Sequence, residues 1–121
     1  MTWERKSSDF RDLEDRTTAF AIQVIKLCKT LPRDAIHRPL IEQIIRSSGS
    51  VGANYREANE ALGKKDFCYR VRIARKETKE TEHWLTLLEE ASQNPLFESL
   101  AIRQEAMELR KIFTAIITKS S

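Results

Sequence analysis

Apolar and small residues recur at alternating spacings of three and four in four stretches of this 121-residue sequence. A mean spacing of 3.5 residues places these side chains on one stripe of an α-helix, and such stripes pack against each other in left-handed bundles. We therefore predict four helices, at about residues 8–31, 39–62, 65–92 and 96–118. Residues that end helices stand between them, namely Pro32, Gly63 and the pair Asn94 and Pro95.

The connections between these segments are only a few residues long, so consecutive helices are expected to run in opposite directions. The predicted fold is an all-α, antiparallel up-down-up-down four-helix bundle that occupies residues 1–121 as a single domain. The sequence has three glycines and three prolines, which is fewer than the turns of a sheet-rich fold require.

The sequence also allows predictions about where the protein is located and whether it binds a metal or a cofactor. No apolar stretch approaches the roughly 20 residues that cross a bilayer, and the first residues lack the apolar core of a signal peptide. We therefore expect a cytoplasmic protein without a membrane partner. Cys28 and Cys68 form no CxxC motif and have no histidine close by, so we expect neither a metal site nor a cofactor.

Seven small residues stand in a row from Ser47 to Ala53, inside the second predicted helix, whose stripe continues to Leu62. The two glycines of this segment should each cost the helix about 1 kcal/mol relative to alanine. We expect close packing against a neighbouring helix to offset this cost. The predicted packing seam consists of Ser48, Gly49, Gly52, Ala53 and Asn54, with the Asn54 amide bonded to another helix or to nearby backbone.

Some apolar residues lie outside the stripes, and two explanations remain open for them. Globular helices often have broad apolar faces, and single apolar residues on a surface are common. Alternatively, these residues form a contact between subunits. The candidates for such an interface are Ile22, Ile25, Ile73 and Trp84, of which the first two lie opposite the stripe of their helix.

Positive charge is concentrated at the start of the third predicted helix. From Lys64 to Lys79 there are seven basic and two acidic residues. Five residues on the face opposite the stripe follow spacings of four, three, four and three, and we call them the basic stripe: Lys65, Tyr69, Arg72, Lys76 and Lys79. Such a row can follow phosphates, while the aromatic ring can stack on an unpaired base.

A weaker second set of candidate contacts consists of Lys64, Arg56, Arg110 and Lys111, which the predicted topology brings to the same end of the bundle. Arg70 and Arg75 lie nearer the packing stripe and could instead pair with acidic residues of neighbouring helices or subunits. The alternative to nucleic-acid binding is that these charges only solvate the outer face of a helix.

Patterns typical of enzymes are weak, and we predict no catalytic residue. Gly63, Lys64 and Lys65 lack the other residues of a phosphate-binding P-loop. An all-helical ribonuclease of the HEPN type needs an arginine followed by a histidine after four to six residues. The pairs Arg33 with His37 and Arg75 with His83 do not have this spacing.

Three segments together resemble a known family: residues 46–58, residues 64–67 and the stretch from Ile73 through Trp84 to Leu85. They resemble bacterial four-helix-bundle proteins encoded within intervening sequences of large-subunit ribosomal RNA genes. Similar proteins include the accessory variability protein of diversity-generating retroelements, which works beside a reverse transcriptase and its template RNA. The resemblance implies a homopentamer whose positive surface binds nucleic acid without strong sequence preference, and it implies no catalytic residue.

These observations together predict a non-enzymatic, self-associating accessory protein that binds RNA or DNA, with a reverse transcriptase as a further candidate partner. One alternative is an interaction scaffold whose basic face docks an acidic protein or a reverse transcriptase. A ribonuclease is the remaining and less favoured alternative. Some members of the family carry proline where this sequence has Gly52, so both a broken and a continuous second helix are compatible with the sequence.

Overall fold

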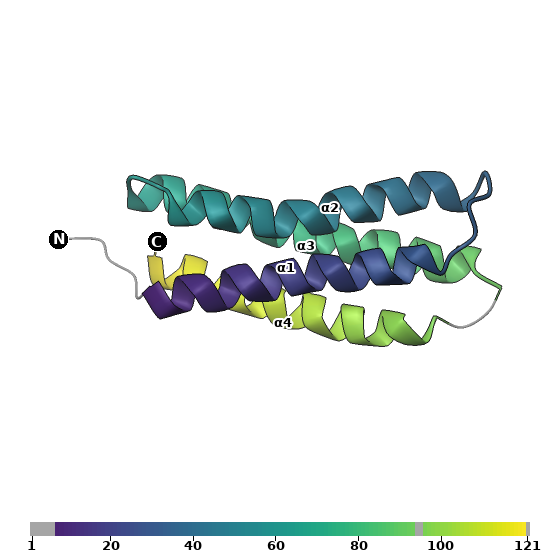
Figure 1. Ribbon diagram of the computed structural model, residues 1–121. Helices are drawn as coiled ribbons and strands as arrows, with labels where there is room; N and C mark the ends of the chain where they lie inside the picture. The colour runs from purple at the N-terminus through teal and green to yellow at the C-terminus, as the bar shows by residue number, and fades with distance from the viewer. Residues whose placement is uncertain (1–6, 94–95, 121) are drawn as a thin grey trace.

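The computed structural model describes residues 7–93 and 96–120. It consists of four α-helices, and no strand occurs among these residues. The helices are α1 (Ser7–Lys29), α2 (His37–Asn59), α3 (Lys64–Ala91) and α4 (Phe97–Ser120), shown in Figure 1. Each boundary lies within three residues of its predicted position, so the heptad pattern located all four helices.

Local chemistry explains where α1 ends and α2 begins. After α1 the chain forms a tight turn, in which the backbone amide of Thr30 donates to the carbonyl of Leu27 at 3.0 Å. The Asp34 carboxylate then accepts hydrogen bonds from the backbone amides of Ile36 (3.1 Å) and His37 (2.8 Å). These amides have no partner within a helix, so Asp34 caps the start of α2.

The end of α2 differs from the prediction. The helix stops at Asn59, and the backbone amides of Glu60 and Ala61 bond to carbonyls three residues earlier. Leu62 is fully exposed and does not belong to the packing stripe. The heptad spacing continues past the point where the chain leaves the helix, and the spacing alone could not show this.

Consecutive helices pack side by side along the rod in Figure 1. Glu89 near the end of α3 bonds to Ser99 and Arg103 near the start of α4, whereas Glu82 bonds to Arg110 further along α4. Residue numbers thus fall along α3 as they rise along α4. The start of α1, the end of α2, the start of α3 and the end of α4 lie at one end of the rod (Figure 1).

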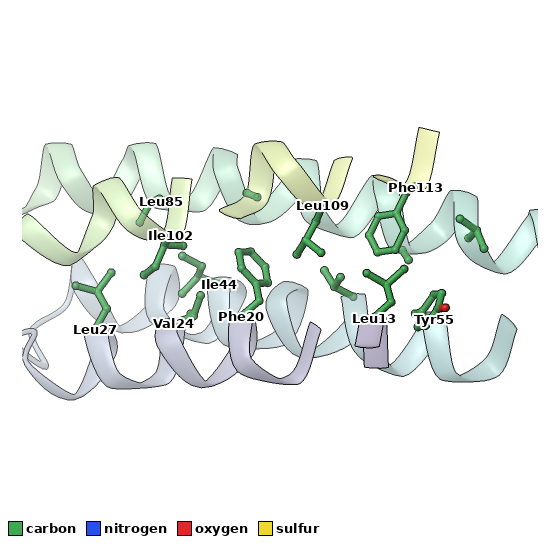
Figure 2. Packing of buried hydrophobic residues seen from close by; sticks show 14 of the residues in the cluster. Leu13, Phe20, Val24, Leu27, Ile44, Tyr55, Leu85, Ile102, Leu109 and Phe113 are labelled. Carbon is green, nitrogen blue, oxygen red and sulfur yellow. The ribbon is translucent and has the colours of Figure 1, made fainter. Parts of the chain in front are cut away.

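The core runs along the axis between the four helices, and Figure 2 shows its side chains pointing inward. Tyr55, Phe20, Phe67 and Phe113 are the largest buried side chains, and the rings of Tyr55 and Phe113 have centroids 6.1 Å apart. Burial of each such side chain contributes about 1.5–3 kcal/mol. The predicted stripes supply this core, including the buried residues Val24, Leu27, Ile44, Val51, Val71, Leu85, Leu88, Ile102 and Leu109.

The small-residue segment has an inner and an outer side, and α2 continues through it without a break. Ser48 and Gly52 are buried, and a Cβ atom at Gly52 would lie 3.0 Å from Oγ1 of Thr17 in α1. The prediction was wrong for Gly49 and Ala53, which are exposed, and a Cβ at Gly49 would meet nothing within 4 Å. One residue turns a helix by about 100°, so neighbours in the sequence fall on different sides.

Asn54 is bonded within its own helix. Its Nδ2 donates to the backbone carbonyl and to the hydroxyl of Ser50, at 2.9 Å in both cases. Of the two roles expected for this amide, the structure shows the bond to nearby backbone.

The candidate interface residues differ in exposure. Ile22 and Ile25 are 45% and 40% exposed, which leaves them available for a contact with another subunit. Ile73 is half-buried, and Trp84 is half-buried and packs against the core. The subunit interface remains a prediction.

Candidate nucleic-acid interface

The five residues of the basic stripe lie together on the outer face of α3, and all five are exposed. They take this position because Val71, Ala74 and Thr78 turn the opposite face of the helix into the core. Among the described residues, none of the four cations of the stripe forms an ion pair. Their charge is therefore not neutralised by a contacting carboxylate.

Several arginines elsewhere in the bundle are paired with carboxylates. Arg16 donates two hydrogen bonds to Glu105, at 2.7 and 2.9 Å, and thereby links α1 to α4. Hydrogen bonding to Glu105 raises the pKa of this guanidinium further. Arg103 bonds to Glu89 at 2.6 Å. These arginines differ from the cations of the basic stripe, because each forms an ion pair with a carboxylate on another helix.

The second set of predicted contacts also contains two kinds of residue, namely ion-paired arginines and lysines that form no ion pair among the described residues. Arg56 pairs with Glu14 at 2.9 Å, and Arg110 pairs with Glu82. These two arginines therefore hold helices together and are less available to a ligand than predicted. Lys64 and Lys111 are exposed, and neither is ion-paired within the described part of the chain. The sequence could not separate these cases, because the pairing depends on which residues of two helices lie opposite each other.

The two remaining arginines of α3 contact neutral groups. Nη1 of Arg75 donates to Oγ1 of Thr114 at 3.2 Å. The guanidinium of Arg70 lies over the ring of Tyr69, 5.7 Å from its centroid. Neither arginine pairs with an acidic residue of a neighbouring helix among the described residues, and pairing with another subunit stays a prediction.

Two open hollows follow the stripe. The first has a volume of about 660 Å³ and the second about 520 Å³. The first is lined by Arg46 of α2 and by Arg72, Arg75, Lys76, Lys79, Glu80, His83 and Trp84 of α3. The second lies near the start of α3 and is lined by Lys64, Lys65, Cys68, Tyr69, Arg72 and Ser120.

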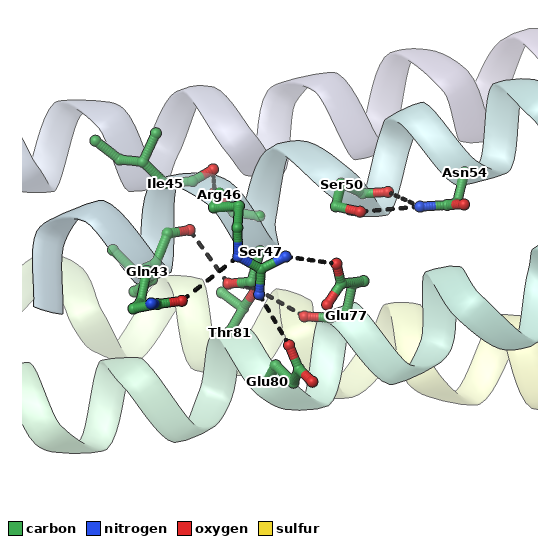
Figure 3. A network of polar contacts seen from close by, with 11 residues as sticks. Gln43, Ile45, Arg46, Ser47, Ser50, Asn54, Glu77, Glu80 and Thr81 are labelled. Atoms are coloured by element: carbon green, nitrogen blue, oxygen red, sulfur yellow. Dashed lines mark hydrogen bonds and ion pairs between the residues drawn. The ribbon is translucent and has the colours of Figure 1, made fainter. Parts of the chain in front are cut away.

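Arg46 joins α2 to the acidic residues beside the stripe (Figure 3). Its two terminal nitrogens each lie 3.1 Å from a carboxylate oxygen, one of Glu77 and one of Glu80. Burial alone would raise the pKa of Glu77, but hydrogen bonding with Glu80, Ser50 and Arg46 outweighs burial and lowers it. Glu77 is therefore held as a carboxylate whose charge is balanced by Arg46.

A buried pair of hydroxyls lies beside this network. Oγ of Ser47 and Oγ1 of Thr81 are 2.9 Å apart (Figure 3). The Thr81 hydroxyl donates to the carbonyl of Glu77 at 2.9 Å, so the Ser47 hydroxyl is the donor between the two, and Oγ of Ser47 also lies 3.3 Å from the carbonyl of Ile44 in its own helix. The polar residues of the small-residue segment therefore serve packing and helix pairing.

Sequence reasoning missed two features of this surface. Arg46 carries no distinguishing signal in the sequence, because its role depends on the register between α2 and α3. His83 could have been found, since it follows Lys79 by four residues and continues the spacing of the stripe. The His83 ring is exposed and lies edge-on to Trp84, with centroids 4.8 Å apart.

Three further findings concern metal binding, membrane crossing and the Cys28 thiol. Within residues 7–93 and 96–120, no three histidine, cysteine, aspartate or glutamate side chains gather as metal ligands. None of the helices, as far as they are described, is long and apolar enough to cross a membrane. Cys28 is buried, and burial raises the pKa of its thiol to about 11.

Comparisons with known proteins agree with this architecture. A crystal structure of a protein with unknown function from the S23 ribosomal protein family of Bacteroides thetaiotaomicron aligns with a TM-score of 0.78 and 35% identity. The alignment covers 86% of this chain and 96% of that chain. No curated protein matches the sequence. Residues 12–115 match the sequence profile of the 23S rRNA-intervening sequence protein family, and the chain belongs to this family.

Proposed function

We propose that this protein is a non-enzymatic accessory protein that binds RNA or DNA through the basic stripe of α3, with little sequence preference. The observation that carries this proposal is the row of Lys65, Arg72, Lys76 and Lys79, which is exposed and has no carboxylate partner among the described residues. Lys65 and Lys79 are 14 positions apart, which corresponds to about 21 Å along a helix that rises 1.5 Å per residue. Such a length matches several consecutive phosphates of a nucleic-acid strand.

The chemistry of the stripe favours phosphate contacts over base recognition. Lysine presents a compact charge on a flexible stem, which suits a phosphate and carries no information about base sequence. Neutralised phosphates release counterions, so binding is expected to weaken as salt rises. With four contacts to a single strand, log K should fall with a slope of about −3 against log salt concentration.

We also propose that the antiparallel up-down-up-down bundle assembles into a homo-oligomer, with the pentamer favoured. The exposed Ile22 and Ile25 on α1 and the family membership support this part of the proposal. Assembly would repeat the stripe on each subunit, and linked sites bind more tightly than separate ones. Light scattering at several protein concentrations measures the size of the assembly, and a monomer at all of them would contradict the proposal.

A charge-reversal experiment tests the role of the stripe. In the stripe variant, Arg72, Lys76 and Lys79 are each changed to glutamate. In the control variant, the same change is made at three exposed cations outside the stripe, Lys29, Arg33 and Arg38. Both variants change the net charge equally, so they separate a local effect from a general one.

The stripe variant should lose binding in gel shifts with single- and double-stranded RNA and DNA, and the control variant should retain it. Circular dichroism and light scattering should show unchanged helicity and size for both. Equal binding by the stripe variant and the wild type would refute the proposal. Wild-type protein that binds no nucleic acid at moderate salt would instead favour docking of an acidic protein or a reverse transcriptase. Cleavage of added RNA that depends on His83 or His37 would favour a ribonuclease.

A further inference from the structure

We infer that the outer face of α3 selects single-stranded nucleic acid, because unpaired bases stack on aromatic rings on either side of the three cations Arg72, Lys76 and Lys79. Tyr69 forms one stacking position, and the pair of His83 and Trp84 forms the other. Arg72, Lys76 and Lys79 hold the phosphates between them. This inference rests on the proposed function and adds the form of strand that the surface takes.

The positions of the rings support a shared face. Tyr69 and His83 are 14 residues apart, which is two heptads, so they project from the same side of α3. Tyr69 is 58% exposed, and His83 is also exposed. Both rings are therefore accessible at the surface, with three cations in line between them.

The Trp84 ring is suited to act as a rigid platform. It is half-buried and packs against the core, while another part of it lines the hollow of about 660 Å³. The His83 ring contacts the Trp84 ring edge-on. Nε1 of Trp84 is buried without a hydrogen-bond partner in the described structure. A ring that is already held in place loses little conformational freedom when a base stacks on it.

The electrostatics of the hollow favour a phosphate chain. Arg72, Arg75, Lys76 and Lys79 line it together with the single carboxylate of Glu80. Arg46 contacts both Glu77 and Glu80, and the four cations of α3 in the lining outnumber the one carboxylate of Glu80. The lining thus combines unneutralised positive charge with an aromatic surface, as sites for unpaired strands do.

The geometry sets the length of strand that can engage both ends. The rings are separated by about 21 Å along the helix axis. A stacked strand advances about 3.4 Å per nucleotide, so about six nucleotides span this distance. In a duplex, base pairing and stacking cover the faces of the bases, and only the phosphate contacts remain.

The test compares three probes, each measured by fluorescence anisotropy at one salt concentration. They are a 12-nucleotide single-stranded RNA, an abasic strand of the same length, and the corresponding RNA duplex. Wild-type protein should bind the RNA strand at least about five-fold more tightly than the abasic strand, because each stacked base is expected to contribute at least that factor. Equal affinity for the two strands would overturn the inference.

Substitutions locate the effect on the two ring positions. The double variant Tyr69→Leu with His83→Leu changes only exposed side chains. Trp84 remains, so the variant should reduce the preference for the RNA strand over the abasic strand by at least about five-fold through loss of the Tyr69 position, and it should leave the affinity for the duplex unchanged. Tyr69→Phe retains a ring and should preserve the difference between strands. Equal losses for all three probes would show that the rings do not stack on bases.

Fluorescence provides a second readout that does not depend on removing Trp84. The sequence contains two tryptophans, so Trp3→Phe leaves Trp84 as the only reporter. The RNA strand should quench its emission, and the abasic strand should not. If every probe binds but none changes the emission and both strands bind equally, the inference fails while the proposed function stands. If no probe binds, both fail.

Discussion

The two glycines of the small-residue segment offer a matched pair of substitutions with opposite expected effects. Gly49 lies on the outer side of α2, where an added Cβ would meet no atom within 4 Å. Alanine at this position should gain the helix preference that glycine lacks, about 1 kcal/mol. In a protein of this size, such a gain raises Tm by about 4 °C.

Gly52 lies against α1, and the same change there meets a close neighbour. The added Cβ would lie 3.0 Å from Oγ1 and 3.4 Å from Cβ of Thr17, and 3.7 Å from its backbone carbonyl carbon. Thr17 is fully buried, and its hydroxyl already bonds to the carbonyl of Glu14 at 3.0 Å, so it has little room to move. Overpacking of this kind costs about 1–3 kcal/mol.

The helix preference of alanine offsets about 1 kcal/mol of that cost at Gly52. We therefore expect Gly52→Ala to be less stable than Gly49→Ala by about 1–3 kcal/mol. Urea unfolding followed by circular dichroism measures the difference, and light scattering checks that all variants have the same size. Thr17→Ala removes the nearest atom, so Gly52→Ala should be less harmful in that background. The reasoning is refuted if Gly52→Ala is as stable as Gly49→Ala.

Three further predictions concern single groups. The pKa of Glu77 is lowered in the folded protein, so its charged form stabilises the fold. This contribution is present above the unfolded pKa of 4.5 and is lost as pH falls through the lower folded pKa. The free energy of unfolding should therefore fall less steeply with decreasing pH in Glu77→Gln than in the wild type. Asp34→Ala removes the acceptor for the first amides of α2 and should lower Tm, whereas Asp34→Asn, which retains an oxygen acceptor, should lower it less; equal Tm values for the wild type and Asp34→Ala would argue against the cap. Cys28 is buried and its thiol pKa is about 11, so mass spectrometry should show little alkylation of Cys28 in the native protein at pH 8 and full alkylation in urea; rapid native labelling would contradict this burial.

Helix positions and the core could be predicted because they depend on local periodicity. Residues such as Phe20, Val51 and Phe113 carry the pattern, and each is fully buried. Side-chain exposure on one helix follows from the same pattern, which is why all five residues of the basic stripe are exposed as expected.

Contacts between helices could not be predicted in the same way. Arg56 and Arg110 resemble the stripe residues in sequence, yet their carboxylate partners lie 42 and 28 residues away. Gly49 and Gly52 are equally small, and only the second faces α1. The difference depends on the rotation and register of two helices, which a heptad pattern does not fix.

The hydroxyl pair of Ser47 and Thr81 gives the bundle a defined alignment. A repeat of seven residues packs almost as well when one helix slides along its neighbour by a whole repeat. Such a slide would place Ser47 opposite Ala74 or Leu88, and neither side chain offers a hydroxyl. The buried bond would be lost, and a polar group in the core would lose a partner. The hydrogen bond between these two hydroxyls thus favours the native alignment of α2 and α3 over alignments that are shifted by one heptad.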